Sequence, residues 1–188
     1  ECGVFGVYSQ ENRNVAHSVY YGLYALQHRG QESAGIAVSF ADKITYYKGM
    51  GLVADVFSGG NINRLPEGDL AVGHVRYSTT GASQLLNAQP VVFTGKCGKM
   101  AVAHNGNLTN TKQLRDELIK ENAVFQTTID SEVIAVLINS LSDGDILTGV
   151  KRACLKFKGS YALVIMTTDK LIAVRDPYGI RPLCIGTA

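Results

Sequence analysis

The sequence of 188 residues contains no tryptophan, four prolines and four cysteines. The cysteines stand at positions 2, 97, 154 and 184, and no two of them form a Cys-x-x-Cys pair. This spacing argues against zinc or iron–sulfur ligation within the chain and favours free thiols in a reducing compartment. Cys154 and Cys184 lie in apolar stretches and are expected to be buried, whereas Cys2 stands almost at the start of the sequence.

Long apolar runs and a strong charge of one sign are also lacking. No run approaches the roughly 18 residues of a membrane span, and no basic stretch leads into an apolar one as in a secretory signal. We therefore expect a cytoplasmic protein. The net charge of +2 gives no reason to expect nucleic acid or an anionic membrane as a partner. With 46% hydrophobic and 18% charged residues, the chain has the composition of one globular domain.

Short runs of β-forming residues alternate with runs at helical spacing. The predicted strands are residues 3–8, 35–40, 44–48, 70–77, 90–94, 99–104, 160–167, 171–175 and 183–186. Helices are predicted around residues 19–26, 111–118, 133–141 and 146–154, the last ended by Gly159. Because strands come in hairpins and helices in adjacent runs, the pattern indicates antiparallel sheets covered by helices rather than a doubly wound parallel sheet.

A glycine motif at Gly49 imitates a dinucleotide-binding loop. It reads Gly-Met-Gly-Leu-Val-Ala after a predicted strand, and Asp69 follows at a distance that suits a ribose contact. However, the strand belongs to a hairpin, and Gly59 and Gly60 would end the following helix early. We interpret the motif as a tight turn that needs positive φ.

Cys2 is the first candidate for catalysis. If Glu1 were removed, the α-amine of Cys2 would be free, and its ordinary pKa of about 7.7–8 makes it a usable base for an adjacent thiol. The alternative interpretation is a small apolar residue that opens a strand.

Three further positions carry suitable polar groups. Asn105 and Gly106 follow a predicted strand and offer two oxyanion donors, or else an ordinary turn. Arg76 ends an apolar strand and suits a carboxylate clamp or a structural ion pair. Asp130 precedes a strongly apolar helix and suits either an ammonium group or the helix N-cap. Together with a thiol, these groups describe attack on the side-chain amide of a free amino acid, for which glutamine is the obvious candidate.

Six motifs occur in an order that identifies a family. They are Cys-Gly-Val-Phe-Gly at 2–6, His-Arg-Gly-Gln-Glu-Ser-Ala-Gly-Ile-Ala at 28–37, the Gly-to-Gly stretch 73–81, His-Asn-Gly-Asn-Leu at 104–108, Asp-Ser-Glu at 130–132 and Asp-Pro-Tyr-Gly-Ile-Arg-Pro-Leu at 176–183. The whole chain resembles the N-terminal glutaminase domain of class II glutamine amidotransferases. Gln-His-Arg-Gly-Gln-Glu-Ser-Ala-Gly and Val-Arg-Tyr-Ser-Thr-Thr-Gly are more similar to the branch that aminates phosphoribosyl pyrophosphate than to the sugar-phosphate branch.

The resemblance implies an α+β, N-terminal-nucleophile hydrolase fold, a four-layer αββα sandwich of two antiparallel sheets. It also implies a set of site residues: Cys2 as the nucleophile, Asn105 and Gly106 as the oxyanion hole, Arg76 and Asp130 for the glutamine carboxylate and amine, Thr79 assisting at the carboxylate, Tyr77 on a loop that closes over glutamine, and Arg29 as a supporting residue. No metal site is implied within residues 1–188.

Further expectations concern the whole protein. The resemblance implies that ammonia passes to a phosphoribosyltransferase domain of the same polypeptide to make 5-phosphoribosylamine, the first step of purine synthesis. That domain, absent here, would need Mg²⁺ and could hold an iron–sulfur cluster, and the full-length enzyme would be a homo-oligomer. We expect residues 1–188 to be a glutaminase domain that is incomplete at its C-terminal end. Because Glu1 precedes Cys2, a catalytically blocked glutamine-binding module stays an alternative, as does a sister amidotransferase with another acceptor.

Overall fold

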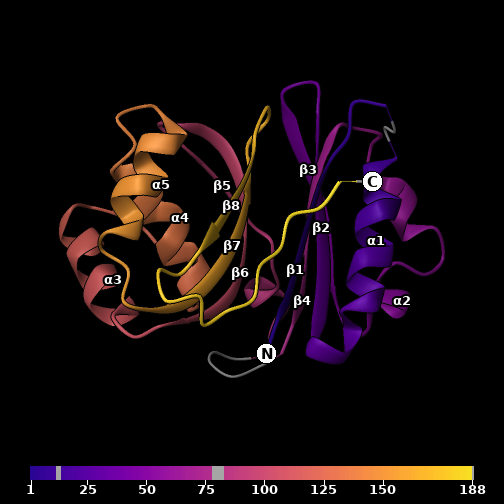
Figure 1. Cartoon of the computed structure of the whole chain (residues 1–188), viewed down its shortest axis with the longest axis horizontal. Coiled ribbons are helices and arrows are strands. Elements are labelled where there is room, and N and C mark those ends of the chain that lie inside the picture. Colours follow the sequence, from indigo (N-terminus) through magenta and orange to yellow (C-terminus); the bar gives the residue numbers. More distant parts are fainter. Residues whose placement is uncertain (12–13, 78–82, 188) are drawn as a thin grey trace.

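The computed structural model describes residues 1–11, 14–77 and 83–187, and within them two antiparallel four-stranded sheets pack face to face (Figure 1). The strands are β1 (Gly3–Tyr8), β2 (Ser33–Phe40), β3 (Lys43–Met50), β4 (Leu70–Arg76), β5 (Val91–Gly95), β6 (Gly98–Leu108), β7 (Gly159–Met166) and β8 (Leu171–Arg175). The helices are α1 (Val15–Ala25), α2 (Val53–Val56), α3 (Thr111–Lys120), α4 (Asp130–Ser140) and α5 (Ile146–Cys154), with 3₁₀ turns at Gln27–Arg29, Asn61–Arg64 and Leu85–Asn87.

The order of strands is β1-β4-β2-β3 in the first sheet and β5-β6-β7-β8 in the second. Helices α1 and α2 cover the outer face of the first sheet, while α4 packs on the second sheet with α3 and α5 beside it (Figure 1). The predicted αββα order of layers is therefore confirmed. No helix in the described part of the chain is both long enough and apolar enough to cross a membrane.

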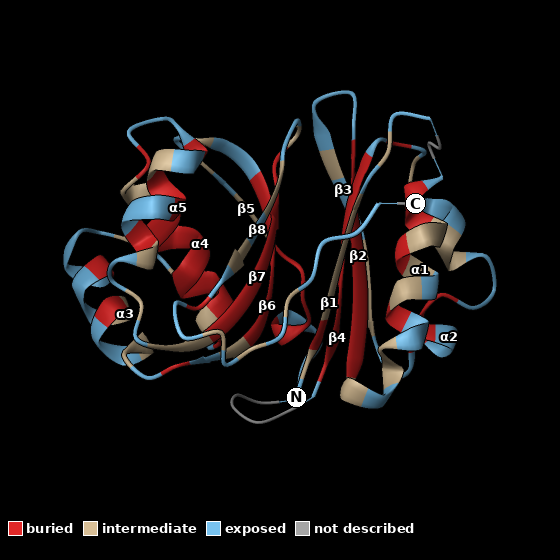
Figure 2. Ribbon diagram, in the orientation of Figure 1, coloured by how far each residue is buried: buried red, intermediate tan, exposed pale blue. Residues whose placement is uncertain are grey.

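Alternation of side chains along the strands produces three apolar layers. One lies between each sheet and its helices, and the third lies between the two sheets; buried residues are concentrated in the central strands (Figure 2). The layer between the sheets contains small residues and is formed by Ala37, Leu70, Val72, Ala101, Ala103, Val164 and Met166. Small side chains allow the two sheets to approach each other closely.

The prediction that a strand ends at residue 104 is wrong. Strand β6 continues to Leu108, and Asn105 and Gly106 pair with Ala162 and Tyr161 of β7. Asn-Gly is a turn signal, but here β7 supplies a complete ladder of partners, so the backbone stays extended.

Two expectations near the ends of elements are also wrong. Residues 183–186 form no strand in the described structure, and Cys184, which was expected to be buried in that strand, is exposed. Helix α5 ends at Cys154, and Gly159 opens β7 instead of ending the helix.

The interpretation of the Gly49 motif is confirmed, because β3 belongs to a hairpin, Gly51 has a φ of 113° and the following helix α2 has four residues.

The pairing of β5 with β6 ends at Val91 and Val102, before the cavity-lining end of β6. Beyond this point, side chains bind the backbone of His104 on that edge. The Gln89 Oε1 accepts from the N–H of His104 at 2.9 Å, and the Nε2 of His74 lies 2.9 Å from the carbonyl oxygen of His104. His74 comes from β4, so this contact joins the two sheets in the interior.

The buried histidine predicts a pH-dependent stability. Burial lowers the pKa of His74 to about 3, although the hydrogen bond to the carbonyl oxygen of His104 acts to raise it. The pKa of a histidine in an unfolded chain is near 6.5. As the pH falls below about 6.5, the unfolded chain binds a proton that the folded chain does not. The free energy of unfolding should then decrease by at most about 1.4 kcal/mol per pH unit for this group. Urea unfolding at several pH values between about pH 7 and pH 5 gives the free energy of unfolding as a function of pH. This free energy should fall less steeply with decreasing pH for His74→Gln than for the unchanged protein, and an equal dependence on pH would contradict this assignment.

Candidate active site

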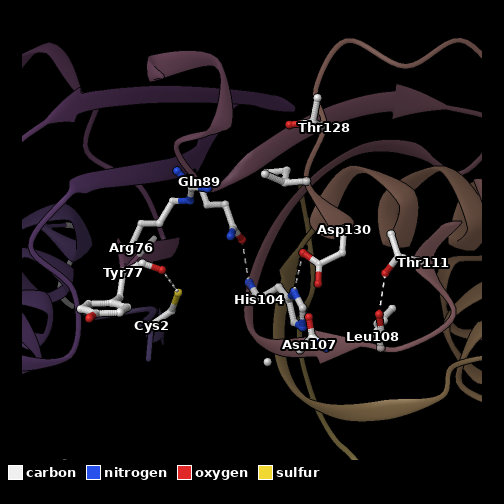
Figure 3. A pocket seen from close by; sticks show the side chains of 12 residues that line it. Cys2, Arg76, Tyr77, Gln89, His104, Asn107, Leu108, Thr111, Thr128 and Asp130 are labelled. Carbon is white, nitrogen blue, oxygen red and sulfur yellow. Dashed lines mark hydrogen bonds and ion pairs between the residues drawn. The ribbon is translucent and has the colours of Figure 1, made fainter. Parts of the chain in front are cut away.

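A cavity of about 180 Å³ opens where the ends of the two sheets meet (Figure 3). Its described lining residues come from the ends of both sheets, from the first residues of α3 and α4, and from the loops beside them: Cys2, Arg76, Tyr77, Gln89, His104, Gly106, Asn107, Leu108, Thr111, Thr128, Ile129 and Asp130. The volume is below the roughly 300–1,000 Å³ of pockets for drug-sized ligands, so the cavity suits a molecule of about amino-acid size.

Cys2 lies at the edge of the first sheet, immediately before β1. Its thiol donates to the carbonyl oxygen of Tyr77 at a sulfur–oxygen distance of 3.8 Å (Figure 3). Burial raises the pKa of the Cys2 thiol, with a smaller opposing effect from the positive charge of Arg76 and a raising effect from Asp130. The thiol is therefore protonated at neutral pH and needs a base to become a nucleophile.

Arg29 fixes the main chain beside this thiol. Its Nε donates to the carbonyl oxygen of Cys2 at 2.9 Å, and its Nη2 lies 2.8 Å from the carboxylate of Glu1. The other oxygen of that carboxylate lies 3.3 Å from Nη1 of Arg181. Arg29 thus holds the backbone at the sulfur-bearing residue without lining the cavity, as a supporting residue does.

The edge of β6 places Gly106 on the cavity wall. Backbone N–H and C=O groups in a strand alternate between its two edges, so the Gly106 N–H faces the same edge as that of His104. Asn105 is 4% exposed and lies behind the cavity wall. Its side chain lies on the same face of β6 as that of Ala103, which faces the first sheet. The structure therefore brings Gly106 to the cavity and Asn105 to the layer next to it.

Arg76 ends β4 and lines the cavity while it pairs with Glu32. The Arg76 Nη1 donates to Oε1 of Glu32, and both side chains are largely buried. The ion-pair interpretation is therefore confirmed, and the same guanidinium also faces the cavity. An ion pair on one side of a planar guanidinium fixes its orientation, because the donors form a rigid fork.

Asp130 does not cap α4, so that interpretation is wrong. It is the first residue of the helix, the N-cap position is Ile129, and no side-chain cap bond forms there. Instead, Oδ1 of Asp130 lies 3.2 Å from Nδ1 of His104 (Figure 3). Burial acts to raise the pKa of Asp130, but the His104 ring and the backbone N–H groups of Leu108 and Asp130 outweigh it, so the pKa is lowered and the carboxylate is charged.

Three residues that orient the predicted site residues or their strand were not predicted from the sequence. His104 orients Asp130, Gln89 binds the backbone of His104, and Glu32 pairs with Arg76. His104 and Glu32 belong to the recognised motifs, but Gln89 carries no motif and becomes visible only when β5 and β6 are paired. Tyr77 lines the cavity and is half exposed, whereas Thr79 lies outside the described residues.

A model of the family described as "Glutamine amidotransferase domain" matches residues 74–188. The chain belongs to this family. It is 51% identical over 187 residues to an amidophosphoribosyltransferase of Methanocaldococcus jannaschii, covering 98% of this chain and 40% of that protein. It is 53% identical over 188 residues to an amidophosphoribosyltransferase of Synechocystis, covering 98% of this chain and 38% of that protein. The chain thus spans about two fifths of the length of these relatives.

Solved structures agree with the sequence comparison. The structure of glutamine phosphoribosylpyrophosphate amidotransferase from B. subtilis, complexed with ADP and GMP, superposes with a TM-score of 0.88 at 41% identity. The match covers 98% of this chain and 39% of that chain. The predicted N-terminal-nucleophile hydrolase fold, with its two antiparallel sheets and outer helices, is therefore confirmed for this glutamine amidotransferase domain.

Because β6 and β7 lie close together at Gly106, we expect that no larger residue is tolerated there. A Cβ at Gly106 would lie 2.1 Å from the carbonyl oxygen of Ser160 and 2.7 Å from Cα of Tyr161. Gly106→Ala should therefore destabilise the domain by about 1–3 kcal/mol, which denaturant unfolding would measure. Gly186→Ala is the control, because a Cβ there has no described neighbour within 4 Å. Equal stabilities of the two variants would contradict this prediction and would show that β6 and β7 can move apart at Gly106 at little cost in free energy.

Proposed function

We propose that this domain hydrolyses glutamine to glutamate and ammonia through a thioester on Cys2. The observation that carries the proposal is one cavity lined by a thiol, a guanidinium and a carboxylate, namely those of Cys2, Arg76 and Asp130. The charges complement a free amino acid, with Arg76 for the α-carboxylate and Asp130 for the α-ammonium. The glutamine side-chain amide then extends toward the thiol.

The reaction has two steps in this proposal. The Cys2 sulfur attacks the amide carbon, and the developing oxyanion receives hydrogen bonds from the Gly106 N–H and from the Asn105 side-chain amide, which would approach it from the layer between the two sheets. Ammonia leaves with the transferred proton, and water then attacks the thioester to release glutamate and restore the thiol. The proton acceptor is the α-amine of Cys2, in a form of the protein from which Glu1 has been removed. Such a base is required because burial keeps the thiol protonated.

The relatives support a proposal about the acceptor. Proteins that share about half of this sequence carry the name amidophosphoribosyltransferase. We accordingly propose that ammonia passes to phosphoribosyl pyrophosphate on a second domain of the same polypeptide, where it displaces pyrophosphate and yields 5-phosphoribosylamine. These names favour this acceptor over that of a sister amidotransferase.

Loss of the thiol is the direct test. Cys2→Ala should abolish glutamine hydrolysis without a change in melting temperature, because Cys2 lies at the edge of the sheet and outside the three apolar layers. Cys184→Ala is a matched control, since it removes an exposed thiol. Hydrolysis that persists in purified Cys2→Ala would refute the proposal. Intact mass of the expressed full-length protein distinguishes an enzyme that starts at Cys2 from a module blocked by Glu1.

The role of Asp130 is tested by a substitution that removes only its charge. Asp130→Asn should raise the Michaelis constant for glutamine at least about tenfold, the scale of a lost charged hydrogen bond of about 1.5–3 kcal/mol. Stability should decrease modestly, because Asp130 also pairs with the buried His104 and its lowered pKa means that the charged carboxylate stabilises the fold. Asp145→Asn makes the same change at the N-cap of α5, where Asp145 accepts from the Thr148 N–H, and should alter neither property. An unchanged Michaelis constant in Asp130→Asn would remove Asp130 from the substrate site.

A further inference from the structure

The segment between α3 and α4 forms one wall of the cavity although it is neither helix nor strand. Thr128 and Ile129 line the cavity, and Asp130 follows them as the first residue of α4. The backbone groups of this segment are partly buried, and partly buried groups outside regular structure take partners from other parts of the chain. Two side chains that do not line the cavity supply most of them.

Glu132 binds two N–H groups of this wall, whereas the N–H of Thr128 lies 3.5 Å from Oδ1 of Asn87. Glu132 is the third residue of α4 and is 6% exposed, and its two carboxylate oxygens point back toward the preceding segment. Oε1 accepts from the N–H of Gln126 at 2.8 Å, while Oε2 accepts from the N–H and from Oγ1 of Thr127, both at 2.7 Å. A carboxylate receives three donors here, and charge-assisted bonds of this kind are roughly twice as strong as neutral ones.

Arg115 holds the carbonyl groups of the same wall. Its Nη1 donates to the carbonyl oxygen of Thr127 at 3.0 Å, and its Nη2 donates to that of Ile129 at 3.2 Å. The guanidinium also lies 4.3 Å from the centre of the Phe125 ring, which limits its rotation. The wall is thus bound by an anion from α4 and by a cation from α3.

We propose that Glu132 and Arg115 are positioning residues for the amino-acid end of the substrate. They act through the segment 126–129, which determines where Thr128 and Asp130 stand relative to Arg76 across the cavity. This proposal rests on the proposed function, because it takes Asp130 as the ligand of the α-ammonium. Cys2 belongs to the opposite sheet, so displacement of this wall weakens glutamine binding and leaves the nucleophile in place.

Glu132→Gln in the full-length protein is the principal test. One side-chain oxygen becomes an NH₂ donor that faces other donors, so part of the wall loses its partner. We expect the Michaelis constant for glutamine to rise about tenfold while kcat changes less than about threefold, with a lower melting temperature. Glu121→Gln is the matched control: it makes the same change on an exposed residue at the end of α3 and should leave all three values unchanged.

A purely structural role would lower the melting temperature without moving the Michaelis constant of the folded enzyme, and that result would overturn the proposal. If Glu132→Gln does not fold, Arg115→Lys decides, because a lysine cannot donate to both carbonyl groups in the same fork. Its Michaelis constant should rise with little change in kcat, and an unchanged constant would again overturn the proposal. Failure of the proposed function is seen separately, since Cys2→Ala would then keep its glutaminase activity.

Discussion

The position at which β5 stops pairing with β6 determines which backbone groups of β6 face the cavity. Pairing ends at Val102, so the following residues of β6 present backbone groups to side chains instead of to a strand. The side chain of Gln89 binds the N–H of His104, and that of His74 binds its carbonyl oxygen. The next N–H on that edge belongs to Gly106 and faces the cavity. If β5 were longer, its backbone would form hydrogen bonds with this edge of β6. The Gly106 N–H would then not be available as a donor to a bound molecule.

The sequence predicts most of this architecture because its strands form local hairpins. Strands β2 and β3 join across two residues and β7 and β8 across four, so alternation and turn residues are sufficient to find them. The end of β6 was missed because its partner β7 begins about fifty residues later, while the local signal at Asn105 and Gly106 is that of a turn. The absent strand at residues 183–186 is the opposite case, an apolar run that pairs with no strand among the residues that the structure describes.

The site was partly predictable for a related reason. The chemical types of Cys2, Arg76 and Asp130 suggest a free amino acid, and the motif order identifies the family. The contacts that orient these groups join distant parts of the chain, such as Glu32 with Arg76 and His104 with Asp130. Sequence spacing contains no information on such pairs, which explains why Asp130 could be taken for a helix cap.

The small residues between the sheets have a consequence for how this domain tolerates variation. Cys2 and Arg76 lie at the end of one sheet, whereas His104 and Asp130 belong to the other half of the molecule. The thickness of the layer that contains Ala101 therefore acts as a spacer between the two halves. A bulkier residue there would retain every side chain that lines the cavity and still change the separation of its two walls.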